Sequence, residues 1–309
     1  MPALQAMADQ RFVVISSRIS RYSDKHFGRG LHNRDSSVRA RVFYLFHRFT
    51  KELRNEISLD LAASLLDNMR DLLPIQVDLP ELESPETQDL LTEAMKNPGI
   101  FDSQIYLFET AGIFTSLFFK DPTQSETLLS SIVKPLMNEL PGNLQAAKVS
   151  NDVTAVLKIH HTVMALGNVA KGFPDLPSPL PEGYILPPLE VFREIGQTIL
   201  VCLEQLNTVK GVRDAVRLTG FCLHPNVHKL KLWQTRFAFA RIVAPTGSNI
   251  TDLIPPLMVN LLAHSEPSEL ADFMNFIGLL VHRLKVSESE PGEVVLTLCS
   301  SGCYDPSSR

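Results

Sequence analysis

The stretch SNDVTAVLKIHHTVMALGNVAKGFP, residues 150–174, decides the fold class. Ser150 is placed to cap a helix, and Gly172 and Pro174 are placed to end it. Apolar and small residues recur at the i, i+3, i+4, i+7 spacing that fills one helix face, namely Val153, Val156, Leu157, His160, Met164, Gly167 and Ala170. Small residues in the second half allow neighbouring helices to come close. The stretch therefore predicts an interior helix of a helical stack, which is a scaffold element and not an active site.

Composition places the chain among globular proteins. Its 309 residues are 44% hydrophobic and 20% charged, with a net charge of -5, which excludes a disordered or a strongly basic protein. No apolar run reaches the roughly 18 to 20 residues that span a bilayer, and residues 1–12 lack the apolar core of a signal peptide. We expect a soluble, intracellular protein without membrane insertion.

The rest of the chain is a succession of predicted helices with almost no strand signals. Helices are predicted at residues 36–57, 58–73, 84–96, 102–119, 121–140, 189–206, 209–215, 236–244, 251–264 and 267–285. Helix pairs beginning near Ser36, Asp102, Ser150, Val209 and Pro267 recur at a spacing near the roughly 40 to 47 residues of HEAT and armadillo repeats. We therefore predict an all-α fold, an α-solenoid of HEAT-type two-helix repeats.

Positive charge is concentrated near the N-terminus. Residues 11–54 hold eleven basic and three acidic residues, a net charge of +8, and residues 78–93 then hold six acids. In the helix 36–57, one face carries Val42, Leu45, Phe46, Phe49, Leu53 and Ile57. The candidate contacts to a polyanion lie on or beside another face and are Arg41, Arg48, Lys51 and Arg54. The alternative is that these side chains pair with acids such as Glu52 or those of residues 78–93.

The other potentially reactive residues do not form a catalytic or metal-binding motif. Adjacent helix positions point about 100° apart, so His160 and His161 cannot hold one metal ion from one face, and we expect a packed or surface pair. His224 and His228 lack the glutamate of a metalloprotease helix. The four cysteines are too few for a disulfide framework, and a lone acid such as Glu109 should satisfy backbone or arginine groups. We predict no catalytic, cofactor-binding or metal site, and no enzyme.

Five stretches carry a family resemblance. They are RVFYLFHRFTKELR (41–54), FDSQIYLFETAG (101–112), HHTVMALGNVAKGFP (160–174), RFAFARIVAPTGSNI (236–250) and PSELADFMNFIGLLVHRL (267–284). Together they resemble exportin-T, the tRNA nuclear exportins of the importin-β (karyopherin) superfamily, in a fungal form. The resemblance spans residues 10–285. It implies a curved HEAT array that binds tRNA together with Ran in its GTP form, contacts nucleoporins, and shuttles between nucleus and cytoplasm. A HEAT scaffold that binds only proteins is the alternative, and a helical hydrolase using the histidines is a third.

The sequence also departs from that family. Exportin-T chains are far longer, so we expect this chain to be a central piece that begins and ends inside the array and exposes apolar faces at both ends. Residues 216–235, VRLTGFCLHPNVHKLKLWQT, interrupt the resemblance and are interpreted as a retained intron. Residues 286–309 form a tail without family character, which we expect to be disordered.

Overall fold

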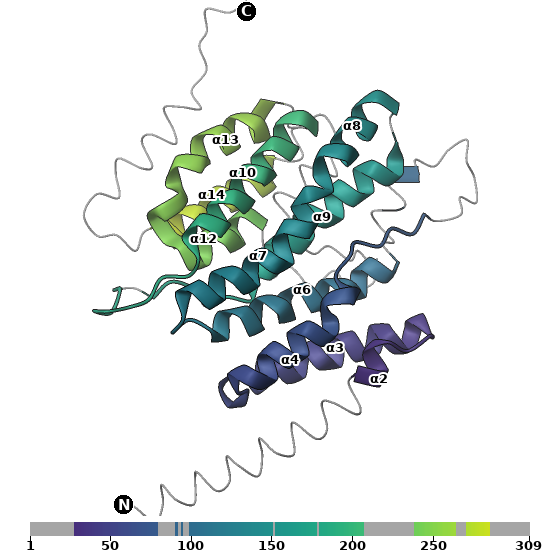
Figure 1. The fold of residues 1–309 in the computed structure, drawn as a ribbon. Coiled ribbons are helices and arrows are strands. Elements are labelled where there is room, and N and C mark those ends of the chain that lie inside the picture. The colour runs from purple at the N-terminus through teal and green to yellow at the C-terminus, as the bar shows by residue number, and fades with distance from the viewer. Residues whose placement is uncertain are drawn as a thin grey trace, which may run out of the picture.

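The computed structural model describes residues 28–79, 90–91, 94, 99–150, 152–177, 179–206, 238–263 and 270–284. All regular structure within these residues is helical, and they contain no strand (Figure 1). The α-helices are α2 (Gly28–Leu31), α3 (Ser36–Glu52), α4 (Leu59–Met69), α6 (Ile100–Leu117), α7 (Pro122–Asn138), α8 (Leu140–Ser150), α9 (Val153–Lys171), α10 (Leu189–Leu206), α12 (Ala238–Thr246), α13 (Ile254–Ala263) and α14 (Leu270–Leu284). Short 3₁₀ segments are η2 (Arg54–Glu56), η3 (Arg70–Leu72) and η4 (Gly247–Leu253). The all-α prediction is confirmed.

The helices stack in two layers, which confirms the solenoid. In the first layer α3 packs against α6, α6 against α9, α9 against α12, and α12 against α14. In the second layer α10 packs against both α7 and α13, while α4 packs on α6 (Figure 1). Along the chain, helices of the first and second layers follow one another as α3 and α4, α6 and α7, α9 and α10, and α12 and α13. One continuous hydrophobic cluster runs through them from Leu31 to Leu280.

Several helix starts lie where the sequence places them. Asp121 caps α7, since its Oδ1 accepts a hydrogen bond of 3.0 Å from the Gln124 N–H, and Pro122 occupies the first helical position. Ser58 caps α4 through its hydroxyl, which accepts a hydrogen bond of 3.3 Å from the Leu61 N–H. These caps satisfy amides that have no partner inside the helix.

The central helix is confirmed as an interior element, but its start is corrected. α9 packs against α6, α8 and α12, and most of its side chains are buried. Asp152, not Ser150, is the cap, because its Oδ1 accepts a hydrogen bond of 2.9 Å from the Thr154 N–H. Ser150 is instead the last residue of α8, where its hydroxyl bonds to the Ala146 carbonyl. The sequence patterns did not predict α8 as a separate helix.

The spacing of the helix starts differs from the predicted repeat. The first-layer helices α3, α6 and α9 begin at Ser36, Ile100 and Val153, and these starts are more widely and unevenly spaced than the regular repeat. The predicted helix 209–215, the insert 216–235 and the tail 286–309 lie outside the described residues. None of the described helices is long and apolar enough to cross a membrane.

Candidate nucleic-acid interface

The two layers carry opposite charge. The first-layer helices α3, α6, α9 and α12 hold seven basic and three acidic residues, a net charge of +4: Arg39, Arg41, Arg48, Lys51, Lys158, Lys171 and Arg241 against Glu52, Asp102 and Glu109. The second-layer helices α4, α7, α10 and α13 hold two basic and six acidic residues, a net charge of -4: Lys134 and Arg193 against Asp60, Asp67, Glu126, Glu190, Glu194 and Glu204. A chain of net charge -5 thus presents a basic layer suited to a polyanion.

Two of the four predicted contacts project from α3 into solvent. Arg41 is exposed, and the Arg48 side chain is 58% exposed. Arg48 lies 3.7 Å from the Glu52 carboxylate one turn later and donates a hydrogen bond of 3.3 Å to the Tyr44 hydroxyl, which raises the pKa of Arg48. Because exposed ion pairs of this kind contribute little, Arg48 remains available to another anion.

The other two predicted contacts, Lys51 and Arg54, turn towards α6. The Nζ atom of Lys51 lies 3.5 Å from Glu109 Oε1, although the lysine side chain remains 56% exposed. Arg54 donates a hydrogen bond of 2.6 Å to the Ser116 hydroxyl, and burial lowers the pKa of its guanidinium. The four residues therefore divide into an exposed pair on α3 and a pair at the α3–α6 interface. Arg54 is the least accessible of them.

The side of α3 that meets the core agrees only in part with the predicted face. Phe46 is buried as predicted and Val42 packs against the core, but Phe43, His47 and Thr50 are also buried and Leu45, expected inward, is 49% exposed. Two of the buried positions are polar, so the apolar period alone does not reveal them. His47 is tolerated inside because α6 presents the polar groups of Thr110 and Glu109 opposite it, whereas the buried Thr50 hydroxyl has no hydrogen-bond partner within the described residues.

Glu109 on α6 is the centre of those polar groups. Its side chain is 5% exposed and receives Lys171 Nζ at 2.5 Å, Lys51 Nζ at 3.5 Å and His47 Nε2 at 3.7 Å. Burial disfavours its charged form, but the attraction of Lys171, His47 and Lys51 outweighs burial and lowers the pKa of Glu109. The expectation of backbone or arginine partners was wrong, because two lysines and a histidine hold this carboxylate. We call these four residues the Glu109 cluster.

A partly buried lysine and a buried arginine of the layer were not identified from the sequence. Lys171, 23% exposed, ends α9, and Arg241 on α12 is 7% exposed and donates a hydrogen bond of 2.8 Å to Asn168 Oδ1. Burial lowers the pKa of Lys171, and Glu109 opposes that effect. Isolated basic residues in apolar helices gave no periodic signal.

Close packing of α6 on α9 brings Lys171 to Glu109. A Cβ atom at Gly112 would lie 2.0 Å from the Val169 carbonyl oxygen, and one at Gly172 would lie 2.4 Å from the Ile113 nitrogen. The two backbones therefore touch at a pair of glycines. The sequence predicted such a close approach at Ala165, Gly167 and Ala170, whereas the structure has it at Gly112 and Gly172.

The histidine pair is packed inside the fold. His160 and His161 are buried, with their Nδ1 atoms 3.0 Å apart, and the His161 ring stacks on Phe101 at a centroid distance of 3.9 Å. Burial lowers the pKa of His160 to about 4, and burial together with His160 lowers that of His161 to about 3. Among the described residues, no three His, Cys, Asp or Glu side chains are grouped to hold a metal ion. Cys202 is buried, which raises its pKa to about 12.

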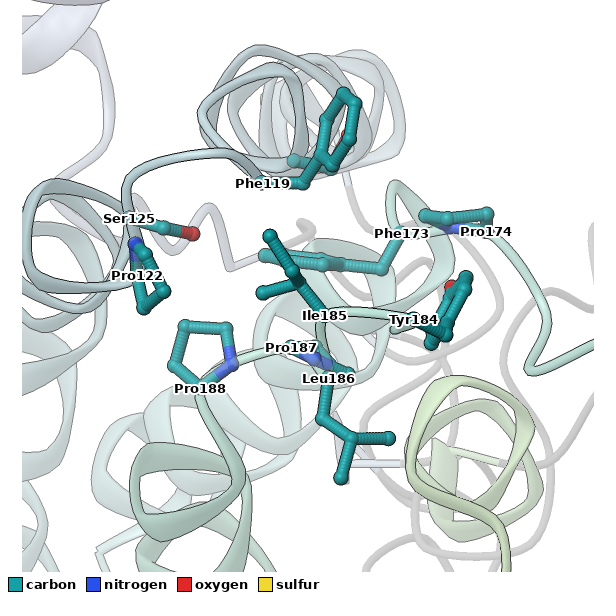
Figure 2. Close-up of a pocket in the computed structure, with 11 residues that line it drawn as sticks. Phe119, Pro122, Ser125, Phe173, Pro174, Tyr184, Ile185, Leu186, Pro187 and Pro188 are labelled. Carbon is teal, nitrogen blue, oxygen red and sulfur yellow. The ribbon is translucent and has the colours of Figure 1, made fainter. Parts of the chain in front are cut away.

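A small, mostly apolar pocket lies beside this layer (Figure 2). Phe119 and Pro122 line it from the α6–α7 connection, Phe173 from the end of α9, and Ile185 and Pro188 from the loop before α10. Phe119 is 55% exposed and Ile185 39%. In the part of the chain that the structure describes, no charged residue lines this pocket.

Comparison with known proteins identifies the family. The Exportin-T family model matches residues 15–290. The chain belongs to the exportin-T family. It is 55% identical to Exportin-T of Laccaria bicolor over 83% of the chain, 48% identical to that of Coprinopsis cinerea over 92%, and 36% identical to that of Mycosarcoma maydis over 83%. These alignments cover 22%, 23% and 22% of the respective relatives, so the chain spans less than a quarter of their length.

Proposed function

We propose that this chain is part of a nuclear export receptor that carries tRNA, together with Ran in its GTP form, through the nuclear pore. Membership of the exportin-T family supports this proposal. Nucleoporins are the proposed partners at the pore, and the receptor shuttles between nucleus and cytoplasm. The chain acts as a binding surface, without a catalytic step or a cofactor.

The observation that carries the proposal is the charge difference between the layers. A tRNA presents one phosphate per nucleotide, and a first layer of net charge +4 attracts it while a second layer of net charge -4 repels it. Arg41 and Arg48 are the foremost candidates for phosphate contact, because both are exposed and arginine forks match phosphate oxygens. Lys51 adjoins them, and Arg54 is a weaker candidate because Ser116 holds it.

Filter binding of several tRNAs, with and without Ran-GTP, tests the proposal. Replacing Arg41, Arg48 and Lys51 by alanine should weaken binding to all tRNAs alike, because phosphate contacts carry no sequence information. The slope of log K against log salt should flatten by about 0.7 to 0.9 for each phosphate that the variant no longer binds. Lys134→Ala is the matched control, since it removes a positive charge from an exposed position in the second layer. Equal losses of tRNA affinity in the control and in the triple variant would contradict the proposal that the first layer contacts the tRNA phosphates.

A scaffold that binds only proteins is the second candidate, and the apolar pocket favours it. An apolar side chain of a partner fits a pocket lined by Phe119, Phe173 and Ile185. This candidate predicts no tRNA binding even at low salt with Ran-GTP present. It also predicts that Phe119→Ala weakens a protein complex, while the arginine variants leave that complex unchanged.

A further inference from the structure

The two lysines of the Glu109 cluster differ in their distance from Glu109 and in their exposure to solvent. Lys171 Nζ lies 2.5 Å from Glu109 Oε2, and its side chain is 23% exposed. Lys51 Nζ lies 3.5 Å from the other carboxylate oxygen, and its side chain is 56% exposed. The inner lysine is therefore held by a short hydrogen bond, whereas the outer lysine is held by a long contact at the surface.

Separating the outer lysine from Glu109 requires little free energy. The contact is long, at 3.5 Å, and the Lys51 side chain is 56% exposed, so an external anion can reach the lysine and displace this contact. Glu109 would keep Lys171 and His47 after Lys51 left, and it would therefore not become an unpaired buried charge. Glu109 itself, 5% exposed, cannot follow Lys51 to the surface.

We propose that Glu109 is an internal competitor for Lys51, which a phosphate of the bound polyanion must displace. In the free protein, Glu109 draws the Lys51 amine towards α6. In the complex, the amine moves to the phosphate while Lys171 and His47 keep the carboxylate in place. Glu109 therefore lowers the affinity for RNA and makes the complex easier to dissociate. This inference rests on the proposed function, which supplies tRNA as the polyanion.

Glu109→Gln tests the inference through the affinity for tRNA. Removing the competing charge should tighten binding by up to about fivefold, because the contact that competes with the phosphate is long and its lysine is more than half exposed. The gain should disappear in the double variant Glu109→Gln with Lys51→Ala. Asp102→Asn is the matched control, because it removes an exposed carboxylate from the same helix and leaves the Glu109 cluster intact. The control should change affinity much less.

A measurement on the unaltered protein covers the case in which Glu109→Gln does not fold. Lysine acetylation, read by mass spectrometry with and without tRNA, should show protection of Lys51 and an unchanged rate at Lys171. Binding of tRNA without protection of Lys51, or a gain in Glu109→Gln that persists without Lys51, would overturn the inference and leave the proposed function standing. Absence of any tRNA binding by the wild-type chain would overturn the proposed function, and the inference with it.

Discussion

Replacing Gly112 by alanine should strongly destabilise this fold, because α6 and α9 touch through their backbones at this residue. The added Cβ would lie 2.0 Å from the Val169 carbonyl oxygen, 2.9 Å from the Val169 carbonyl carbon and 3.1 Å from the Gly172 Cα. Ordinary contact begins at 3.4 Å, so the helices would have to separate by about 1.4 Å at this point. All three obstructing atoms belong to the backbone, which no rotamer change can move away.

The expected change in the free energy of unfolding follows from two opposing effects. Overpacking of a well-packed interior costs about 1 to 3 kcal/mol, and a clash with backbone belongs at the upper end. Alanine forms helices better than glycine, and this difference stabilises the variant by up to about 1 kcal/mol. We therefore expect Gly112→Ala to lower the free energy of unfolding by about 2 kcal/mol. Separation of α6 from α9 would also lengthen the contact between Glu109 and Lys171.

Gly278→Ala is the matched control. Gly278 is an exposed residue of α14, and a Cβ atom there meets no other atom within 4 Å. The same substitution should stabilise the chain at this position by about 0.5 to 1 kcal/mol. Urea unfolding followed by circular dichroism measures both variants. A Gly112→Ala protein at least as stable as the wild type, or two variants that shift in the same direction, would refute the close packing of α6 on α9.

Three further predictions concern buried polar groups and caps. Because the pKa values of His160 and His161 are lowered to about 4 and about 3, stability is full above about pH 6.5 and falls as the unfolded chain takes up protons below it. His161→Phe should make that fall shallower in thermal melts across this pH range, and an unchanged profile would contradict the assignment. Asp121→Ala removes the acceptor for the Gln124 N–H and should lower the free energy of unfolding by about 1 kcal/mol, whereas an unchanged value would argue against the cap. Gln104→Leu leaves the Leu72 and Pro74 carbonyls without the side-chain amide that donates to both. The free energy of unfolding, measured in urea, should fall by about 1 to 3 kcal/mol, and a smaller decrease would indicate that water replaces the amide.

Helix periodicity predicted most of the described elements, and the exceptions have identifiable causes. α8 was missed because Pro141 and Gly142 lie in its first turn, and these residues usually mark a break. Proline is tolerated there because first-turn amides have no partner inside the helix. The cap of α9 was predicted at Ser150 and lies at Asp152, because both side chains can cap a helix and the local sequence does not show which one does.

The candidate interface could be predicted only in part. Local spacing identified Arg41 and Arg48, whose exposure depends on their own helix. It could not identify the contacts of Lys51 and Lys171 with Glu109, because those pairs are separated by 58 and 62 residues and depend on how α3, α6 and α9 are stacked. Long-range ion pairs follow from tertiary packing, and a single sequence carries no direct record of it.

The Glu109 cluster connects the packing of the first layer with its charge. The Glu109 carboxylate is 5% exposed and needs partners. They come from the helices on either side of α6 in the first layer, α3 and α9. Directional contacts of this kind are met in one relative placement of the three helices, whereas apolar contacts tolerate sliding. The two lysines bring more positive charge than one carboxylate neutralises. The same contacts that align α3, α6 and α9 therefore leave a surplus of positive charge along the layer, beside the arginines that we propose as phosphate contacts.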